Sequence, residues 1–389
     1  MKKIRVLVVE DSLTVRSRLV ATLASDPEIE VVGEAEDGAR GIALCTRLRP
    51  DVMTLDMVLK NGTGVEVTEH VMAYCPTPIV IVSASFNRGE MLNTYDALAA
   101  GALEVIEKPT GKEPDGAWER RFIDTVKIAS KIKVITHVRG KLRSTTPLPG
   151  TLSALAHSPP TTEREPVSPS RRGSMITPRP PAPAAIHAEG SRRYTCVAMG
   201  ASTGGPGAVV RILRELQPPL PLPVLLVIHL GQPFGQAFAD WLNQMVPVPV
   251  AEARQGEPLP PPGVGRVLMA PPDRHLFVEG GRLCLSEGPE RHSCRPSVDV
   301  LFESVARELG PSAIGCLLTG MGKDGATGLL EMKRAGAMTL AQDEPTSVVF
   351  GMPREAIRLG AASRILPLGD FAKTLLALSG APQSREGSR

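Results

Sequence analysis

Ser202 lies in the stretch GASTG, residues 200–204, between an apolar run and a helix-like pattern. A serine on a tight turn between a strand and a helix can act as a nucleophile, and backbone N–H groups at the helix start can stabilise an oxyanion. The spacing also suits a phosphate-binding loop, but no Gly-Lys-Ser/Thr ending follows, and the next apolar run ends in His229 rather than an acid. A third interpretation is a serine that only caps the next helix.

Two further residues could complete a catalytic site around this serine. A nucleophilic serine needs a base, and the base needs a carboxylate that orients it. His229 ends the apolar run PVLLVIHL and is the candidate base, while Asp324 in LLTGMGKDGATG is the candidate acid on a glycine-rich loop. Taken singly, they fit a core or surface histidine and a helix-capping aspartate equally well. Their shared position at predicted strand ends of one domain favours acyl-transfer chemistry.

Four other polar residues are weaker candidates for this site. His275 flanks a predicted strand with no nucleophile near it in sequence, and His292 in RHSCRPSVD could line a substrate groove. Cys294 is an alternative nucleophile without a sequence motif to support it. Asp299 is expected to cap or open the helix that contains VDVLFESVA.

A second group of polar residues follows predicted strands in the first third of the chain. These residues are Glu10, Asp11, Asp56, Ser83 and Lys108. In a parallel sheet the carboxyl ends of the strands meet at one edge, so these side chains are expected to converge there. The carboxylates suit Mg²⁺, and the hydroxyl and the amine suit phosphate oxygens. Each residue alone would fit a helix cap or a solvated loop.

The elements that must position these residues alternate between apolar β-rich runs and helical patterns. This alternation predicts parallel sheets covered by helices, in two separate α/β domains. We expect a doubly wound (βα)5 domain over residues 1–125 and a parallel-sheet hydrolase domain over residues 191–382. Residues 126–190 comprise a helix end and a Pro/Ser/Arg-rich flexible linker, and residues 383–389 form a polar tail. The strands are predicted at 4–10, 30–35, 52–57, 78–84, 104–108, 194–200, 223–230, 265–271 and 313–320, with helices at 13–25, 38–48, 115–135, 297–310 and 325–337.

Composition excludes several classes of function. A net charge of +3 is too small to indicate nucleic acid as a partner, and 3% aromatic residues provide no stacking platform. The six cysteines form no Cys-x-x-Cys pair, which indicates reduced thiols. The first apolar run is too short for a signal peptide and the longest later one is too short to span a bilayer, so we expect a cytoplasmic protein with no membrane insertion.

Residues 1–125 resemble a response-regulator receiver domain, on the strength of the five polar residues at strand ends. The resemblance implies that Asp56 is the phospho-accepting aspartate. It also implies that Glu10, Asp11, Asp56 and the backbone carbonyl of Val58 hold Mg²⁺, and that Ser83 and Lys108 contact the phosphoryl group.

The segment after Asp56 departs from the receiver pattern. The segment DMVLKNGTG has Leu59, Lys60, Thr63 and Gly64 at the positions where the family usually has a Met-Pro pair and then Asp-Gly. Val105 also stands where the family has a switch aromatic. The sequence therefore leaves open whether phosphorylation of the first domain still controls the second domain.

Several motifs in order resemble the CheB family of chemotaxis methylesterases. They are GASTGG, the strand-end His229, RPSVDVLF, LLTGMGKDGATG and VVFGMPREAI. The resemblance implies hydrolysis of glutamyl methyl esters on methyl-accepting chemotaxis receptors and deamidation of receptor glutamines, with no cofactor for hydrolysis. It assigns Ser202 as nucleophile, His229 as base, Asp324 as supporting acid and the N–H of Met321 as oxyanion donor. It also implies that the receiver blocks the site until the histidine kinase CheA phosphorylates it.

Two other functions remain open from the sequence. One is a signalling adaptor that binds receptors and is either catalytically silent or independent of phosphorylation. The other is an esterase or amidase that acts on a different protein, because the motifs specify acyl chemistry better than they specify the substrate.

Overall fold

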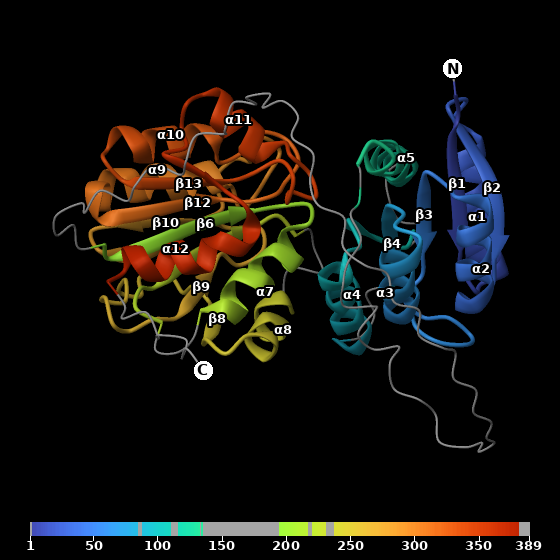
Figure 1. Ribbon diagram of the computed structural model, residues 1–389, viewed down its shortest axis with the longest axis horizontal. Helices are drawn as coiled ribbons and strands as arrows, with labels where there is room; N and C mark the ends of the chain where they lie inside the picture. Colours follow the sequence, from blue (N-terminus) through green and yellow to red (C-terminus); the bar gives the residue numbers. More distant parts are fainter. Residues whose placement is uncertain are drawn as a thin grey trace, which may run out of the picture.

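The structure is a computed structural model, and it describes residues 2–84, 88–109, 116–132, 134, 194–216, 220–230 and 237–380. Most of the predicted linker and the whole predicted polar tail lie outside the described residues. Figure 1 shows two bodies, each built around its own sheet. No helix within the described ranges is both long and apolar enough to cross a bilayer.

The N-terminal body is a parallel sheet in the order β2-β1-β3-β4-β5. Its helices begin where short polar side chains accept the first free N–H groups: Ser12 accepts from Val15 N, and Asp37 accepts from Arg40 N. The strands are β1 (Ile4–Val9), β2 (Ile29–Ala35), β3 (Val52–Leu55), β4 (Ile79–Ser83) and β5 (Glu104–Glu107). The helices are α1 (Leu13–Ala24), α2 (Gly38–Leu48), α3 (Gly64–Tyr74), α4 (Arg88–Ala100) and α5 (Ala117–Ala129).

The helix predicted over 115–135 is shorter in the structure. Helix α5 ends at Ala129, because the following N–H groups bond back three residues, from Lys131 to Ile128 and from Ile132 to Ala129. Such tightened turns close a helix rather than extend it. The prediction of a helix running on towards the linker was therefore wrong beyond this point.

The C-terminal body is a larger parallel sheet in the order β14-β13-β12-β6-β7-β9-β8, with a separate antiparallel hairpin, β10-β11. Helices lie on both faces of the sheet (Figure 1). The strands are β6 (Cys196–Ala201), β7 (Val224–Ile228), β8 (Val250–Glu252), β9 (Val267–Met269), β10 (His275–Glu279), β11 (Arg282–Ser286), β12 (Ala313–Leu317), β13 (Met338–Gln342) and β14 (Arg364–Leu366). The α-helices are α7 (Gly205–Glu215), α8 (Phe238–Met245), α9 (Val298–Leu309), α10 (Ala326–Arg334), α11 (Met352–Arg358) and α12 (Phe371–Leu378), with short 3₁₀ turns at Gly310–Ser312 and Leu368–Asp370. The predicted fold class is confirmed for both domains.

The central strands β6, β7 and β12 are buried along their whole length. This explains why they read as continuous apolar runs in the sequence. The chain leaves β6 at Ser202 and β7 at His229, so both residues lie at the same edge of the sheet.

The two bodies meet through helix α4 of the first and helices α7 and α8 of the second (Figure 1). The ring of Tyr95 packs against Phe238 and Trp241, with ring centroids 5.3 and 5.5 Å apart. Trp241 Nε1 donates a 2.9 Å hydrogen bond to Asp96 Oδ1. Apolar contacts continue across this boundary as one buried cluster.

Candidate active site and phosphorylation site

Ser202 follows β6 directly and is held by its backbone. Its N–H donates to Thr319 O at 3.0 Å, and its carbonyl accepts from Gly205 N at 2.6 Å. The residue that caps α7 is Gly204, with no side-chain cap bond. The interpretation of Ser202 as a helix cap is therefore wrong.

Two glycines allow neighbouring segments to approach this serine closely. Gly204 has φ of +75°, and a Cβ there would lie 2.5 Å from Val348 Cβ. A Cβ at Gly320 would lie 2.8 Å from Ser202 Cβ. Any larger residue at either position would displace the turn that carries the hydroxyl.

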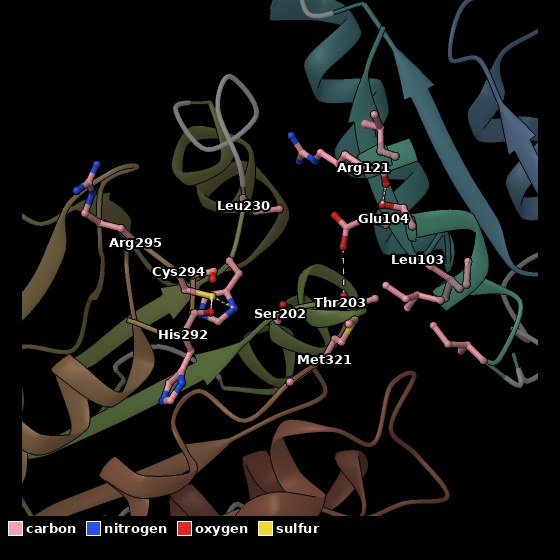
Figure 2. A pocket seen from close by; sticks show the side chains of 18 of the residues that line it. Leu103, Glu104, Arg121, Ser202, Thr203, Leu230, His292, Cys294, Arg295 and Met321 are labelled. Carbon is pink, nitrogen blue, oxygen red and sulfur yellow. Dashed lines mark hydrogen bonds between the residues drawn. The ribbon is translucent and has the colours of Figure 1, made fainter. Parts of the chain in front are cut away.

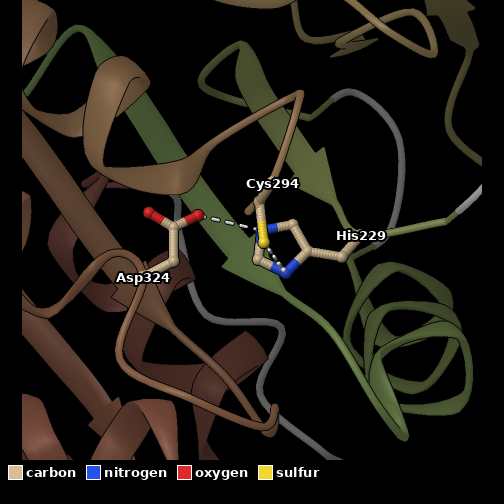
Figure 3. A group of neighbouring side chains, drawn as sticks. All are labelled: His229, Cys294 and Asp324. Carbon is tan, nitrogen blue, oxygen red and sulfur yellow. Dashed lines mark hydrogen bonds and ion pairs between the residues drawn. The ribbon is translucent and has the colours of Figure 1, made fainter. Parts of the chain in front are cut away.

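His229 is oriented by Asp324, a carboxylate from the loop after β12. His229 Nε2 lies 2.9 Å from Asp324 Oδ2 (Figure 3). Since the ionised carboxylate can only accept, Nε2 carries the proton of the neutral imidazole and the lone pair is on Nδ1, whereas the imidazolium carries a proton on both nitrogens. Nδ1 lies 3.6 Å from Cys294 Sγ.

Asp324 is 2% exposed and accepts hydrogen bonds from several groups besides His229. Its oxygens accept from Ser297 Oγ at 2.7 Å and from the backbone N–H of Val298 at 2.7 Å. They also accept from the N–H of Asp299 at 3.1 Å and of Gly325 at 3.0 Å. Asp324 thus caps the N-terminus of α9 from outside the helix while it bonds the candidate base, His229. The sequence offered helix capping and orientation of His229 as alternative roles for Asp324, and in the structure Asp324 makes the hydrogen bonds of both.

The ionisation of this pair follows from burial and hydrogen bonding. Burial alone would raise the pKa of Asp324, but the bonds from His229, Ser297 and Asp299 N–H hold that pKa below its usual range. Burial alone would lower the pKa of His229, but Asp324 and then Cys294 raise it to about 9. The imidazolium is therefore strongly stabilised at this position.

Ser202, His229 and Cys294 line one cavity of about 430 Å³, together with Thr203 and Met321 (Figure 2). Within the described part of the chain, no hydrogen bond joins the Ser202 hydroxyl to His229. Catalytic hydrogen bonds are often long before substrate binds. Met321 is 46% exposed at the cavity mouth, and among the described residues its N–H has no acceptor.

The receiver-like body supplies the opposite wall of this cavity. Glu104 of β5 and Arg121 of α5 line it (Figure 2). Glu104 Oε2 accepts a hydrogen bond from Thr203 Oγ1 at 3.2 Å, one residue after the candidate nucleophile. Burial raises the pKa of Glu104.

The acidic cluster of the first body lies at the carboxyl ends of its strands. Glu10, Asp11 and Asp56 each place an oxygen within 4.8 Å of the others. Lys108 Nζ lies 2.7 Å from Asp56 Oδ2 and 2.9 Å from Glu10 Oε2. Three carboxylates, two of them buried, form an all-oxygen donor set that fits Mg²⁺.

Burial and mutual repulsion govern this cluster. Burial and the neighbouring Asp56 raise the pKa of Glu10 to about 7, against the opposing effect of Lys108. Burial also raises the pKa of Asp56, while Lys108 opposes the rise. A cation at this position would relieve the repulsion between the acids.

The other two predicted residues of this cluster flank it. Ser83 ends β4 and is buried. Val58 is half exposed and bridges to Thr63 across the loop. Thr63 itself caps α3 in a reciprocal capping box with Glu66.

Each of the two bodies matches a known protein family. The family model for the response regulator receiver domain matches residues 6–114, and the one for CheB methylesterase matches residues 197–375. A protein-glutamate methylesterase/protein-glutamine glutaminase 1 of Syntrophus aciditrophicus is 40% identical over 97% of this chain and 99% of its own length. The chain belongs to the CheB methylesterase family. A second relative, the protein-glutamate methylesterase/protein-glutamine glutaminase of Nitrosospira multiformis, is 41% identical over 96% of this chain and 97% of its own. The crystal structure of the Thermotoga maritima CheB methylesterase catalytic domain is 34% identical and covers 48% of this chain and 98% of its own, with a TM-score of 0.45.

The weaker candidates have distinct surroundings in this methylesterase. His275 is buried, accepts from Ser297 N at 3.1 Å and lies 3.1 Å from Pro289 O, so it supports the fold. Asp299 is buried in the first turn of α9 and lies 3.1 Å from His292 Nε2. His292 lines the cavity, and Cys294 contacts His229 there.

Sequence reasoning missed two contributors to the candidate active site. Ser297 holds Asp324, and Glu104 reaches the cavity from the other body. The RPSVDVLF motif contained Ser297, so a capping position before the helix could have indicated the first. No signal in the sequence indicated the second.

Proposed function

We propose that this chain hydrolyses glutamyl methyl esters of methyl-accepting receptors and deamidates receptor glutamines, with Ser202 as nucleophile. Membership of a family named for these reactions supports the substrate class. The observation that carries the residue assignment is the 2.9 Å bond between His229 and Asp324, in a cavity shared with Ser202.

The reaction proceeds in two steps. Ser202 Oγ attacks the ester carbonyl carbon while its proton passes to Nδ1 of His229, and the N–H of Met321 donates to the oxyanion. Asp324 stabilises the imidazolium that forms. Methanol leaves with the proton from His229, and water then attacks the acyl-serine with His229 again as base. With a glutamine substrate, ammonia leaves in place of methanol.

Phosphorylation of Asp56 gates this site. The receiver covers the cavity, and β5 connects the two sites directly: Lys108 at its end bonds Asp56, and Glu104 at its start bonds Thr203. Glu10, Asp11, Asp56 and the carbonyl of Val58 would hold Mg²⁺, which neutralises charge on the phosphodonor. Lys108 and Ser83 then contact the phosphoryl group, so Lys108 no longer bonds the free carboxylate. A histidine kinase, CheA in this family, is the expected phosphodonor.

The small side chain of Val105 changes how this gate operates. Val105 is buried in the cluster that crosses the domain boundary. A buried valine cannot swing outward as a surface aromatic ring can. Movement of β5 as a whole is therefore the route by which Asp56 affects Thr203.

Purified full-length protein mixed with radiomethylated receptor membranes tests the proposal. Methanol release is measured in Mg²⁺ with and without a small-molecule phosphodonor, and with Ser202→Ala and Asp56→Asn as matched variants. Release should rise with the donor, should not rise in Asp56→Asn, and should be absent in Ser202→Ala.

Each part of the proposal has its own contrary outcome. No release under any condition would favour a silent adaptor. Equal release with and without the donor would reject gating, and release by Ser202→Ala would reject the nucleophile. Release from other methylated proteins but not from receptors would reject the substrate class.

A further inference from the structure

The thiol of Cys294 and the free ring nitrogen of His229 are spaced as two ligands of one metal ion. Cys294 Sγ and His229 Nδ1 are 3.6 Å apart. A tetrahedral zinc ion with Zn–S of about 2.3 Å and Zn–N of about 2.0 Å separates its sulfur and nitrogen ligands by about 3.5 Å. The pair therefore needs almost no rearrangement to bind such an ion.

Asp324 prepares the imidazole for this role. Its Oδ2 accepts from His229 Nε2, so in the neutral imidazole the lone pair is on Nδ1, the nitrogen nearest to Cys294. A carboxylate that bonds the far nitrogen of a histidine is the usual outer partner of a zinc-bound imidazole. The oxygens of Asp324 already accept from Ser297 and from the N–H groups of α9, so Asp324 orients the ligand and does not itself bind the metal.

We propose that a thiophilic divalent cation of the zinc type binds between His229 Nδ1 and Cys294 Sγ and inhibits the esterase. The cavity of about 430 Å³ leaves room for water, or the Ser202 hydroxyl, to complete the coordination. The bound ion occupies the lone pair that takes the serine proton, so the base is blocked. The inhibition rests on the proposed function, whereas the binding site does not.

The donor set distinguishes this site from the magnesium site of the receiver. Thiolate and imidazole select zinc-type ions, while carboxylates alone select Mg²⁺. Among the residues that the structure describes, the two other clusters of possible ligands contain no sulfur. They are Glu10, Asp11 and Asp56 in the receiver and His292, Asp299 and Asp324 beside the cavity. The buried thiols of Cys45 and Cys75 also lie 3.7 Å apart, so a sulfur-dependent metal signal is assigned to the proposed site by its loss in Cys294→Ser.

Binding is tested with Co²⁺ as a spectroscopic probe, on full-length protein in excess Mg²⁺. We expect a sulfur-to-cobalt charge-transfer band that Zn²⁺ removes at one equivalent. Cys294→Ser and His229→Gln should abolish the band. Cys284 is a partly buried cysteine on β11, and Cys284→Ser should keep the band. Asp324→Asn should weaken Zn²⁺ binding about 10- to 100-fold. Absence of the band, or its persistence in Cys294→Ser, would overturn the site.

A second measurement separates this proposal from the proposed function. Zn²⁺ should inhibit methanol release, a chelator should restore it, and Cys294→Ser should need at least about tenfold more Zn²⁺ for the same inhibition, because one of the two protein ligands is lost. An active esterase that shows no cobalt band would reject the metal site alone. A cobalt band without inhibition would reject Nδ1 as the base.

Discussion

If His229 is the base, as proposed, its hydrogen bond with Asp324 sets the strength of that base, and Asp324→Asn tests this prediction. The pKa of His229 is about 9, against an ordinary value of 6.5. At 1.36 kcal/mol for each pKa unit, this difference corresponds to about 3 kcal/mol of imidazolium stabilisation. The asparagine keeps the size of the side chain but removes the charge, so the pKa of His229 should fall to about 6.5 or below.

The effect on catalysis depends on pH. A stabilisation of about 3 kcal/mol of the imidazolium formed in the transition state is worth up to about 300-fold in rate. At pH 9.5 the base is mostly unprotonated in both proteins, so Asp324→Asn should lose up to about 200-fold in kcat/KM. At pH 7 only about 1% of wild-type His229 is unprotonated, against about 75% in the variant, so the loss should shrink to about fourfold.

Methanol release from receptor membranes, measured from pH 6 to pH 10, checks this prediction. Ser202→Ala at each pH corrects for spontaneous ester hydrolysis. The wild-type rate should rise up to about pH 9, and the variant rate should level off near pH 6.5. A ratio of wild type to variant that is constant across this range would refute the reasoning, as would a wild-type profile that levels off at the ordinary histidine pKa.

The same shift predicts how the free energy of unfolding depends on pH. A folded-state pKa above the unfolded value gives stability that is fully present below pH 6.5 and is lost as pH rises through about 9. The difference in unfolding free energy between wild type and Asp324→Asn should therefore be larger at pH 6 than at pH 9.5. Urea unfolding at the two values measures it, and a gap that widens with pH would contradict the sign.

Three further substitutions test the packing around the site. Ser297→Ala removes the 2.7 Å bond to Asp324 Oδ1 and should lower the free energy of unfolding in urea by about 1.5–3 kcal/mol. The pH profile of methanol release should stay that of wild type, because His229 bonds the other oxygen of Asp324. Gly204→Ala should cost about 1–3 kcal/mol in thermal unfolding because φ is +75° and the new Cβ lies 2.5 Å from Val348 Cβ. Adding Val348→Gly, which removes that Cβ together with both methyl groups, should recover only the steric part when compared with Val348→Gly alone. Trp241→Phe removes the 2.9 Å bond to Asp96 but keeps a ring, and should raise methanol release without phosphodonor roughly fivefold or more.

Each of these three has a clear contrary result. A shifted pH profile in Ser297→Ala would mean that both oxygens of Asp324 tune the base. Full recovery by Val348→Gly would mean that φ at Gly204 contributes nothing. Unchanged basal release in Trp241→Phe would mean that this interface does not hold the receiver over the cavity.

The parallel sheets and the edge where their polar residues meet could be predicted from sequence. Fully buried strands are apolar on both faces, so β6 and β7 appear as continuous runs that end where the first polar residue follows. Ser202 and His229 are those residues. Because parallel strands share one carboxyl edge, their proximity follows from the element order alone.

The position of Cys294 could not be predicted. His292 and Ser293 have φ of +53° and +58°, and this turn carries Cys294 back over the imidazole. Positive φ is normally signalled by glycine or asparagine, and neither occurs here. The extent of α5 was also missed, because the residues after Ala129 continue a helix-like pattern in the sequence although the backbone turns.

The contacts between the two bodies left no signal in the sequence either. They combine apolar packing around Tyr95 with two polar pairs, Glu104 with Thr203 and Asp96 with Trp241, on elements far apart in the chain. Such pairs have no periodicity, and each residue alone reads as an ordinary surface position. Only the relative placement of two folded bodies makes them partners.

The double role of Asp324 restricts how this chain can lose its activity during evolution. A substitution at Asp324 would remove the carboxylate that bonds the proposed base and would also take an acceptor from the first N–H groups of α9, so the chain would lose stability together with activity. Ser202 is different, because its place is set by backbone bonds and its side chain caps no helix. Substitution of Ser202 therefore removes hydrolysis with the least loss of stability. A descendant protein that still binds receptors but no longer hydrolyses them is expected to carry a replacement at Ser202.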